Sequence, residues 1–127
     1  LYAFTGRNEP DAGLDCWDAV TGKRKWREEF FWKTEIQGRQ FGWSFFRGSI
    51  LRADGKFITL GEMGTLALMD LTPEKGKVLH QAELFAARET WTLPAISKGL
   101  LYVVQNQPDL KTDAKRRVLC YDFRKAE

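Results

Sequence analysis

A five-residue pattern occurs three times in this chain, and it restricts the fold more than any other feature of the sequence. In each copy a mostly apolar stretch ends in an aspartate, and the copies are Leu14-Asp15-Cys16-Trp17-Asp18, Leu66-Ala67-Leu68-Met69-Asp70 and Val118-Leu119-Cys120-Tyr121-Asp122. The three closing aspartates are equally spaced, and another short apolar stretch precedes each copy. Self-similarity at a fixed period indicates a repeat architecture built from one supersecondary motif. The sequence therefore predicts a repeated pair of β-strands.

Turn residues extend this pair to a four-stranded antiparallel unit. Asp54-Gly55 separates two apolar stretches, and Lys98-Gly99 has the same place in the next copy. Asp-Gly favours a tight hairpin because both positions tolerate positive φ. Turns at residues 61–64 and around Gly76 would connect the later strands. With the strands of a unit labelled A to D, we expect strands B to D in residues 1–30, a complete unit in 48–85 and strands A to C in 92–124.

Several of these strands are apolar on both faces, as the alternate residues Leu66 and Leu68 on one side and Ala67 and Met69 on the other illustrate. A half-exposed hairpin would instead alternate apolar and polar residues. Blades that stack face to face around an axis bury both sides. The expected fold is therefore all-β: a β-propeller of four-stranded antiparallel blades, present as a single partial, C-terminal piece of about three blades. A β-sandwich is the alternative.

One turn carries a resemblance to a known family. Residues 18–26, Asp-Ala-Val-Thr-Gly-Lys-Arg-Lys-Trp, resemble the D-x-x-T-G-x-x-x-W turn of pyrroloquinoline-quinone-type (quinoprotein-like) β-propeller repeats. An aspartate can accept hydrogen bonds from turn amides, a glycine can adopt positive φ, and a tryptophan can dock on the neighbouring blade. In the second copy His80 stands where the tryptophan would fall. The proposed structural blade motif comprises Asp18, Thr21, Gly22, Trp26, Asp70 and Asp122.

The resemblance implies a function as well as a fold. It favours a non-catalytic repeat protein that acts as a binding or protein-interaction scaffold in an extracytoplasmic compartment, periplasmic or secreted. The expected partner is the rest of the propeller, another protein or a small polar ligand, and we expect no cofactor in this chain. The alternative is that the chain is part of a quinone-dependent dehydrogenase whose catalytic residues lie outside this chain. Only that alternative calls for pyrroloquinoline quinone and calcium.

Long connections predict where binding would occur, because rigid scaffolds present binding residues on loops. In a meander of this kind the D-to-A connections, residues 31–47 and 85–91, share one face with the B-to-C connections, residues 5–13 and 105–117. The candidate binding face comprises Arg39, Trp43, Arg88, Glu89, Trp91 and Asn106, with Arg7, Asn8, Glu9, Gln40, Gln107 and Asp109 beside them. Aromatic, charged and amide groups together suit a planar polar ligand or a peptide. Alternatively, Trp43 and Trp91 simply pack between blades.

Other classes of function find little support in the sequence. His80 is the only histidine, so a histidine-based metal site or catalytic triad would depend on one residue in an outer strand. Cys16 and Cys120 form no metal-ligand spacing and are expected to be small buried hydrophobic residues. The net charge is only +3, with basic residues spread along the chain, so we expect no nucleic-acid partner. No apolar run approaches the roughly 18 residues of a membrane-spanning helix.

Overall fold

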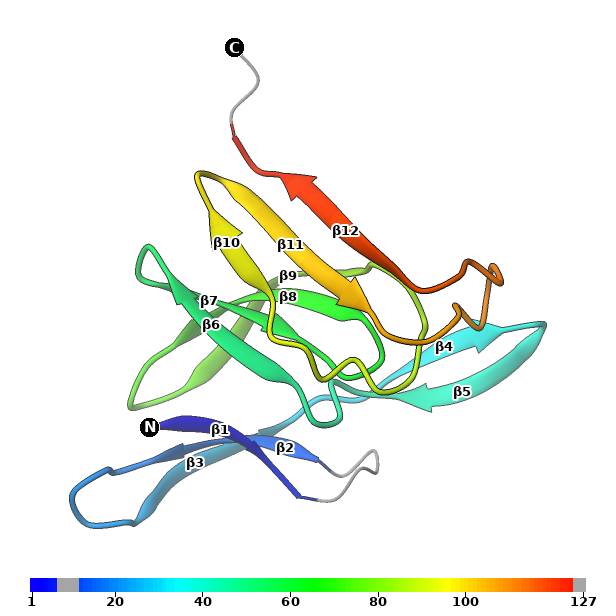
Figure 1. Cartoon of the computed structure of the whole chain (residues 1–127). Coiled ribbons are helices and arrows are strands. Elements are labelled where there is room, and N and C mark those ends of the chain that lie inside the picture. The colour runs from blue at the N-terminus through cyan, green and yellow to red at the C-terminus, as the bar shows by residue number, and fades with distance from the viewer. Residues whose placement is uncertain (7–11, 125–127) are drawn as a thin grey trace.

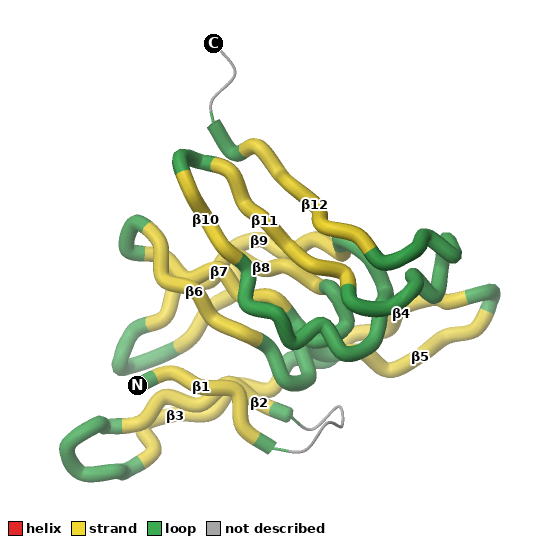
Figure 2. The backbone as a smooth tube through the Cα atoms, in the orientation of Figure 1, coloured by secondary structure: helices red, strands yellow, loops and turns green. Residues whose placement is uncertain are grey.

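The computed structural model describes residues 1–6 and 12–124, and within them the chain is all-β. Figures 1 and 2 show how its antiparallel sheets are arranged. The sheets are an N-terminal sheet of β1 (Tyr2–Thr5), β2 (Gly13–Trp17) and β3 (Arg24–Glu29); a hairpin of β4 (Trp32–Ile36) and β5 (Arg39–Trp43); a central sheet of β6 (Ser49–Ala53), β7 (Lys56–Leu60), β8 (Thr65–Leu71) and β9 (Gly76–Glu83); and a C-terminal sheet of β10 (Ala95–Ser97), β11 (Leu100–Gln105) and β12 (Arg117–Asp122).

The strands predicted in residues 1–30, 48–85 and 92–124 are present, and the central sheet has its four strands in sequence order. Two of the turns adopt the expected conformation. The φ angles of Asp54 and Gly55 are 47° and 74°, and those of Lys98 and Gly99 are 50° and 77°. Two consecutive residues at positive φ match the right-handed twist of the flanking strands. These dipeptides therefore fix the registers of β6 with β7 and of β10 with β11.

Residues 31–47 connect β3 to β6 as expected, but the expectation that they form a loop was wrong. This segment is not one long loop, because Trp32–Ile36 pairs with Arg39–Trp43 in an antiparallel hairpin. Gln37 and Gly38 form its turn, with φ angles of 50° and 75°. Glutamine is not among the residues that usually mark such a turn, which explains why this hairpin was not predicted.

The repeat predicts which face of its sheet each residue of β2, β8 and β12 occupies. Equivalent residues do pack on equivalent faces. Leu14 of β2 packs against Met69 and Leu71 of β8 in one hydrophobic cluster, so the N-terminal sheet covers one face of the central sheet. On the other face, Leu66 packs in a second cluster that includes Leu101 and Val103 of β11. The central sheet is therefore buried on both sides, as continuously apolar strands predict.

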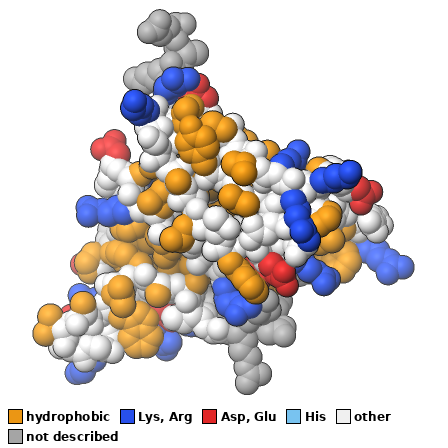
Figure 3. Space-filling model, in the orientation of Figure 1, with side chains coloured by type: hydrophobic (Ala, Val, Ile, Leu, Met, Phe, Trp, Pro, Cys, Tyr) orange, Lys and Arg blue, Asp and Glu red, His pale blue; other side chains and the backbone are white. Residues whose placement is uncertain are grey.

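No other described sheet covers the outward face of the C-terminal sheet. Figure 3 shows hydrophobic side chains over this face. Tyr102 of β11 and Val118 of β12 are 38% and 67% exposed. Cys16 is buried as expected, whereas Cys120 is exposed because it occupies the corresponding outward position. The prediction that both cysteines are buried was thus wrong for Cys120.

The pairing between the third and fourth strands of a unit is interrupted at the same place in two copies. The register shifts between Cys16 and Trp17 in the β2–β3 pair and between Leu68 and Met69 in the β8–β9 pair. A β-bulge of this kind inserts one extra residue and increases the local twist.

No helix among the described residues is long and apolar enough to cross a membrane.

Candidate functional site

Four connecting segments meet at one end of the central sheet, and backbone hydrogen bonds join them. The N–H of Glu62, in the β7–β8 turn, donates to Phe45 O over 3.0 Å, and Glu62 O accepts from the N–H of Thr90 over 3.0 Å. The N–H of Leu110, in the β11–β12 connection, donates to Ala86 O over 2.7 Å. The connections that follow β5, β7, β9 and β11 therefore form one continuous surface.

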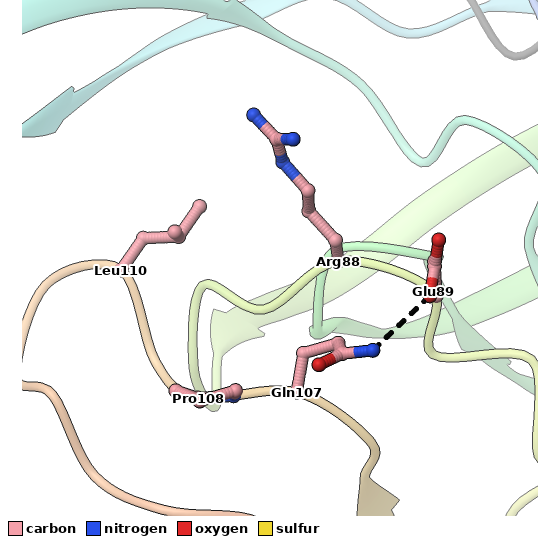
Figure 4. Close-up of a pocket in the computed structure, with 5 residues that line it drawn as sticks. All are labelled: Arg88, Glu89, Gln107, Pro108 and Leu110. Carbon is pink, nitrogen blue, oxygen red and sulfur yellow. Dashed lines mark hydrogen bonds between the residues drawn. The ribbon is translucent and has the colours of Figure 1, made fainter.

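Two adjoining pockets open on this surface, and Arg88 and Glu89 line both. The first has a volume of about 380 Å³, and its lining residues are Arg88, Glu89, Gln107, Pro108 and Leu110, drawn in Figure 4. The second has a volume of about 310 Å³, and its lining residues are Phe46, Glu62, Met63, Arg88 and Glu89. We call the two pockets together the loop groove. Arg88 and Glu89 form the wall that the two pockets share, so one positive and one negative side chain lie in the middle of the loop groove.

Arg88 is exposed, and its guanidinium makes no hydrogen bond or ion pair to any residue of 1–6 or 12–124. In Figure 4 its side chain extends from the backbone of the groove without meeting another drawn group. A guanidinium offers five N–H donors in a planar fork that fits a carboxylate. Arg88 is thus the donor that the groove has free for a ligand.

Glu89 is held in place by the neighbouring loop. Its backbone has a positive φ of 59°, which is unfavourable for a residue with a side chain. Its carbonyl oxygen accepts from Asn106 Nδ2 over 2.7 Å, and its carboxylate accepts from Gln107 Nε2 over 3.2 Å. These two amides orient Glu89 before any ligand binds.

Glu62 fixes the opposite wall of the groove. The residue is 2% exposed, and its Oε1 accepts a hydrogen bond from Trp91 Nε1 over 2.9 Å. Its Oε2 lies 3.5 Å from Arg47 Nε, and the Arg47 guanidinium also lies 5.6 Å from the Trp91 ring centroid. Trp91 itself is 58% exposed. The sequence pointed to Trp91 but not to Glu62 or Arg47, because nothing in the sequence marks a buried glutamate within a short turn.

Asp109 joins the β11–β12 connection to the segment after β9. Its Oδ1 accepts from the N–H groups of Lys111 and Thr112 over 2.7 and 3.0 Å, and its Oδ2 accepts from the N–H of Ala86 over 3.2 Å. Burial by itself raises the pKa of Asp109, but these backbone donors outweigh it, so the pKa lies below its ordinary value. A charged Asp109 therefore holds Leu110 at the edge of the groove.

The remaining candidates of the binding face do not line this groove. Trp43 is 4% exposed and packs edge-on against Phe46 at 5.7 Å, so packing is its role and its ring does not face a ligand. Arg39 is exposed on β5, opposite Ile36. Its guanidinium has no ion pair or hydrogen bond within the described ranges. Arg7, Asn8 and Glu9 lie outside the described residues.

The blade-motif residues form turns at the other end of the strands. Asp18 Oδ1 accepts from the N–H groups of Thr21 and Val20 over 2.8 and 3.0 Å, and these bonds lower the pKa of Asp18. Gly22 has a φ of 68°. Trp26 Nε1 donates to Thr72 O of the central sheet over 2.9 Å. The motif residues of the first copy thus stabilise a turn and a sheet interface.

The later copies use different groups for the same turn. Asp70 forms an ion pair with Lys56 over 3.0 Å, and Thr72 Oγ1 instead accepts from the N–H groups of Glu74 and Lys75. Asp122 is bonded to the side chain of Arg124 and accepts from its N–H over 3.0 Å, which lowers the pKa of Asp122. The aspartate is therefore common to the three copies. Asp18 and Asp122 both accept from the N–H two residues further on, whereas Asp70 pairs with Lys56 instead.

His80 is exposed on β9, opposite Leu68. Within the part of the chain that the structure describes, no group of three or more His, Cys, Asp or Glu side chains could hold a metal ion. The sequence matches no protein-family model, and no curated protein matches it.

Proposed function

We propose that this chain is part of a quinoprotein-like β-propeller and that it acts as a non-catalytic binding scaffold, with the loop groove holding an extended segment of a partner protein. The stacking of three antiparallel sheets, each covering the next, supports a propeller. The motif turn at Asp18 supports the quinoprotein-like type. The extracytoplasmic location that the resemblance implies belongs to the same proposal.

The observation that carries the binding role is the free guanidinium of Arg88 between two pockets. Within the described residues Arg88 has no partner of its own, whereas the adjacent Glu89 accepts hydrogen bonds from Asn106 and Gln107. A carboxylate in the partner would give Arg88 a bidentate, charge-assisted hydrogen bond. Pro108 and Leu110 beside it would contact an apolar side chain of the same segment. The expected ligand is therefore a peptide with an acidic residue next to an apolar one.

A peptide-display selection tests this proposal. Random peptides selected against the chain should be enriched in Asp or Glu beside an apolar residue, and Arg88→Ala should weaken their binding about 10- to 100-fold, as loss of a hydrogen bond to a charged group does. Isothermal titration calorimetry measures the affinities. Arg52→Ala is the matched control, because Arg52 is exposed on β6 near the opposite, Asp54-Gly55 end of the central sheet.

Two results contradict the proposal. One is a set of selected peptides without acidic enrichment. The other is equal affinity for the wild-type chain and for Arg88→Ala, since the groove would then not be the binding site.

A further inference from the structure

The second pocket of the loop groove has a lining that the role of Arg88 leaves unexplained. Besides Arg88, its charged lining residues are Glu62 and Glu89. Glu89 forms no ion pair with a described residue, and the hydrogen bond that its carboxylate accepts comes from the uncharged side chain of Gln107. A partner carboxylate bound to Arg88 would neutralise the one cation of this lining. Two negative side chains would then remain in the pocket.

Glu62 is the buried member of this pair, and one of its oxygens has no hydrogen-bond donor. Oε1 accepts from Trp91 Nε1, but Oε2 accepts no hydrogen bond from any described residue. Arg47 forms an ion pair with Oε2, but their separation of 3.5 Å is long for an N–H···O bond, and the Arg47 side chain is half exposed. A buried carboxylate oxygen without a donor costs free energy, so a ligand that donates to Oε2 would recover that cost. With Arg88 engaged by the partner, two carboxylates share the one guanidinium of Arg47.

Phe46 and Met63 supply the apolar part of the same pocket. Phe46 has a φ of 51°, which is unfavourable for a bulky side chain. Its N–H donates to Ser44 Oγ over 2.9 Å, and its ring packs edge-on against Trp43, so the surrounding structure fixes this conformation. The fold therefore holds an aromatic ring in the pocket that the two carboxylates line.

This combination of groups fits a basic side chain. An ammonium or guanidinium has enough N–H donors to bond to both carboxylates. A cation is also attracted to the face of an aromatic ring, and the aliphatic part of a lysine or arginine side chain packs on apolar groups such as those of Phe46 and Met63. The pocket volume of about 310 Å³ leaves room for one long side chain.

We propose that the second pocket binds a basic side chain of the partner segment, on the other side of its acidic residue from the apolar one. This inference rests on the proposed function, in which Arg88 binds the acidic residue between the two pockets and Pro108 and Leu110 contact the apolar residue. Glu62 and Glu89 then bind the basic residue. The groove therefore selects the order apolar, acidic, basic along the partner, in either chain direction.

The peptide-display selection tests this inference separately from the proposed function. Among peptides enriched in Asp or Glu beside an apolar residue, the position on the other side of the acidic residue should be enriched in Lys or Arg. The same library selected against Glu62→Gln should keep the acidic enrichment and show a weaker basic one, since glutamine retains an acceptor for Trp91 Nε1 but has no charge. Glu74→Gln is the matched control, because Glu74 is exposed in the β8–β9 turn at the opposite end of β8 and its loss removes the same charge.

Calorimetry with a selected peptide measures the size of the effect. Replacing the basic residue by an uncharged analogue, norleucine for lysine or citrulline for arginine, should weaken binding to the wild type about tenfold, as loss of a hydrogen bond between charged groups does. The difference between the two peptides should shrink in Glu62→Gln and persist in Glu74→Gln. If Glu62→Gln does not fold, the comparison of the two peptides on the wild-type chain still decides.

Three outcomes overturn this inference and leave the proposed function in place: acidic enrichment without basic enrichment, equal affinity of the charged and uncharged peptides for the wild type, or a difference between them that is unchanged in a folded Glu62→Gln chain. Absence of the acidic enrichment would contradict the proposed function and this inference together.

Discussion

At the scale of single residues, Asp109 stabilises the loop groove through three backbone N–H groups on two segments. Asp109→Asn would replace an acceptor by an NH2 group and leave a donor facing a donor. We expect the free energy of unfolding at neutral pH to fall by about 1–3 kcal/mol, the cost of an unsatisfied buried polar group. Urea denaturation measures it. Asp113→Asn is the control, because Asp113 is exposed in the same loop and its φ of 57° suits asparagine.

The same substitution predicts a dependence on pH. The pKa of Asp109 lies below its ordinary value of 3.8 in the folded chain. Its carboxylate therefore stabilises the fold fully above pH 3.8, and this contribution is lost as the pH falls below 3.8 toward the folded-state pKa. The difference in stability between the wild type and Asp109→Asn should shrink in that window. A difference that stays constant down to the lowest pH at which the chain folds would contradict this role.

At the scale of elements, the β4–β5 hairpin has a turn whose sequence is not optimal. Gln37 and Gly38 both have positive φ, and asparagine before glycine is preferred in such a turn. We expect Gln37→Asn to raise the free energy of unfolding by about 0.5 kcal/mol, measured by urea denaturation. Gln40→Asn, in the extended β5, should instead be neutral or destabilising. Equal effects of the two substitutions would show that the turn geometry is not the cause.

The elements also show what the sequence could predict. The strands around Asp54-Gly55 and Lys98-Gly99 were predictable, because each dipeptide fits its turn and apolar residues flank it. The β4–β5 hairpin was missed because glutamine gives no turn signal.

The site was predictable only in part. Arg88, Glu89, Trp91 and Asn106 lie together because the order of the strands brings their loops to one end. Glu62 and Arg47 could not be found, because their interaction depends on how a four-residue turn meets a segment far away in sequence. The burial of Trp43 likewise depends on tertiary packing against Phe46.

At the scale of the whole molecule, the stability of the stack depends on contacts such as that of Trp26 with the central sheet. The indole donates to Thr72 O, and its ring lies against Gly76 so closely that a Cβ added there would be 2.9 Å from Trp26 Cη2. Gly76→Ala should therefore overpack the interface and lower the free energy of unfolding by about 1–3 kcal/mol. This cost arises between two sheets, not within one.

A double-mutant cycle separates that cause from any effect of Gly76 on its own strand. In a Trp26→Phe background the smaller ring leaves room for the new methyl group, so Gly76→Ala should cost less, with a coupling free energy of about 0.5–3 kcal/mol. Trp17→Phe is the control, because Trp17 lies on the opposite face of the N-terminal sheet beside Arg24 and should combine additively with Gly76→Ala. Additive effects of Gly76→Ala and Trp26→Phe would mean that the two sheets do not pack at this point in solution. The stacking of sheets would then no longer support a propeller.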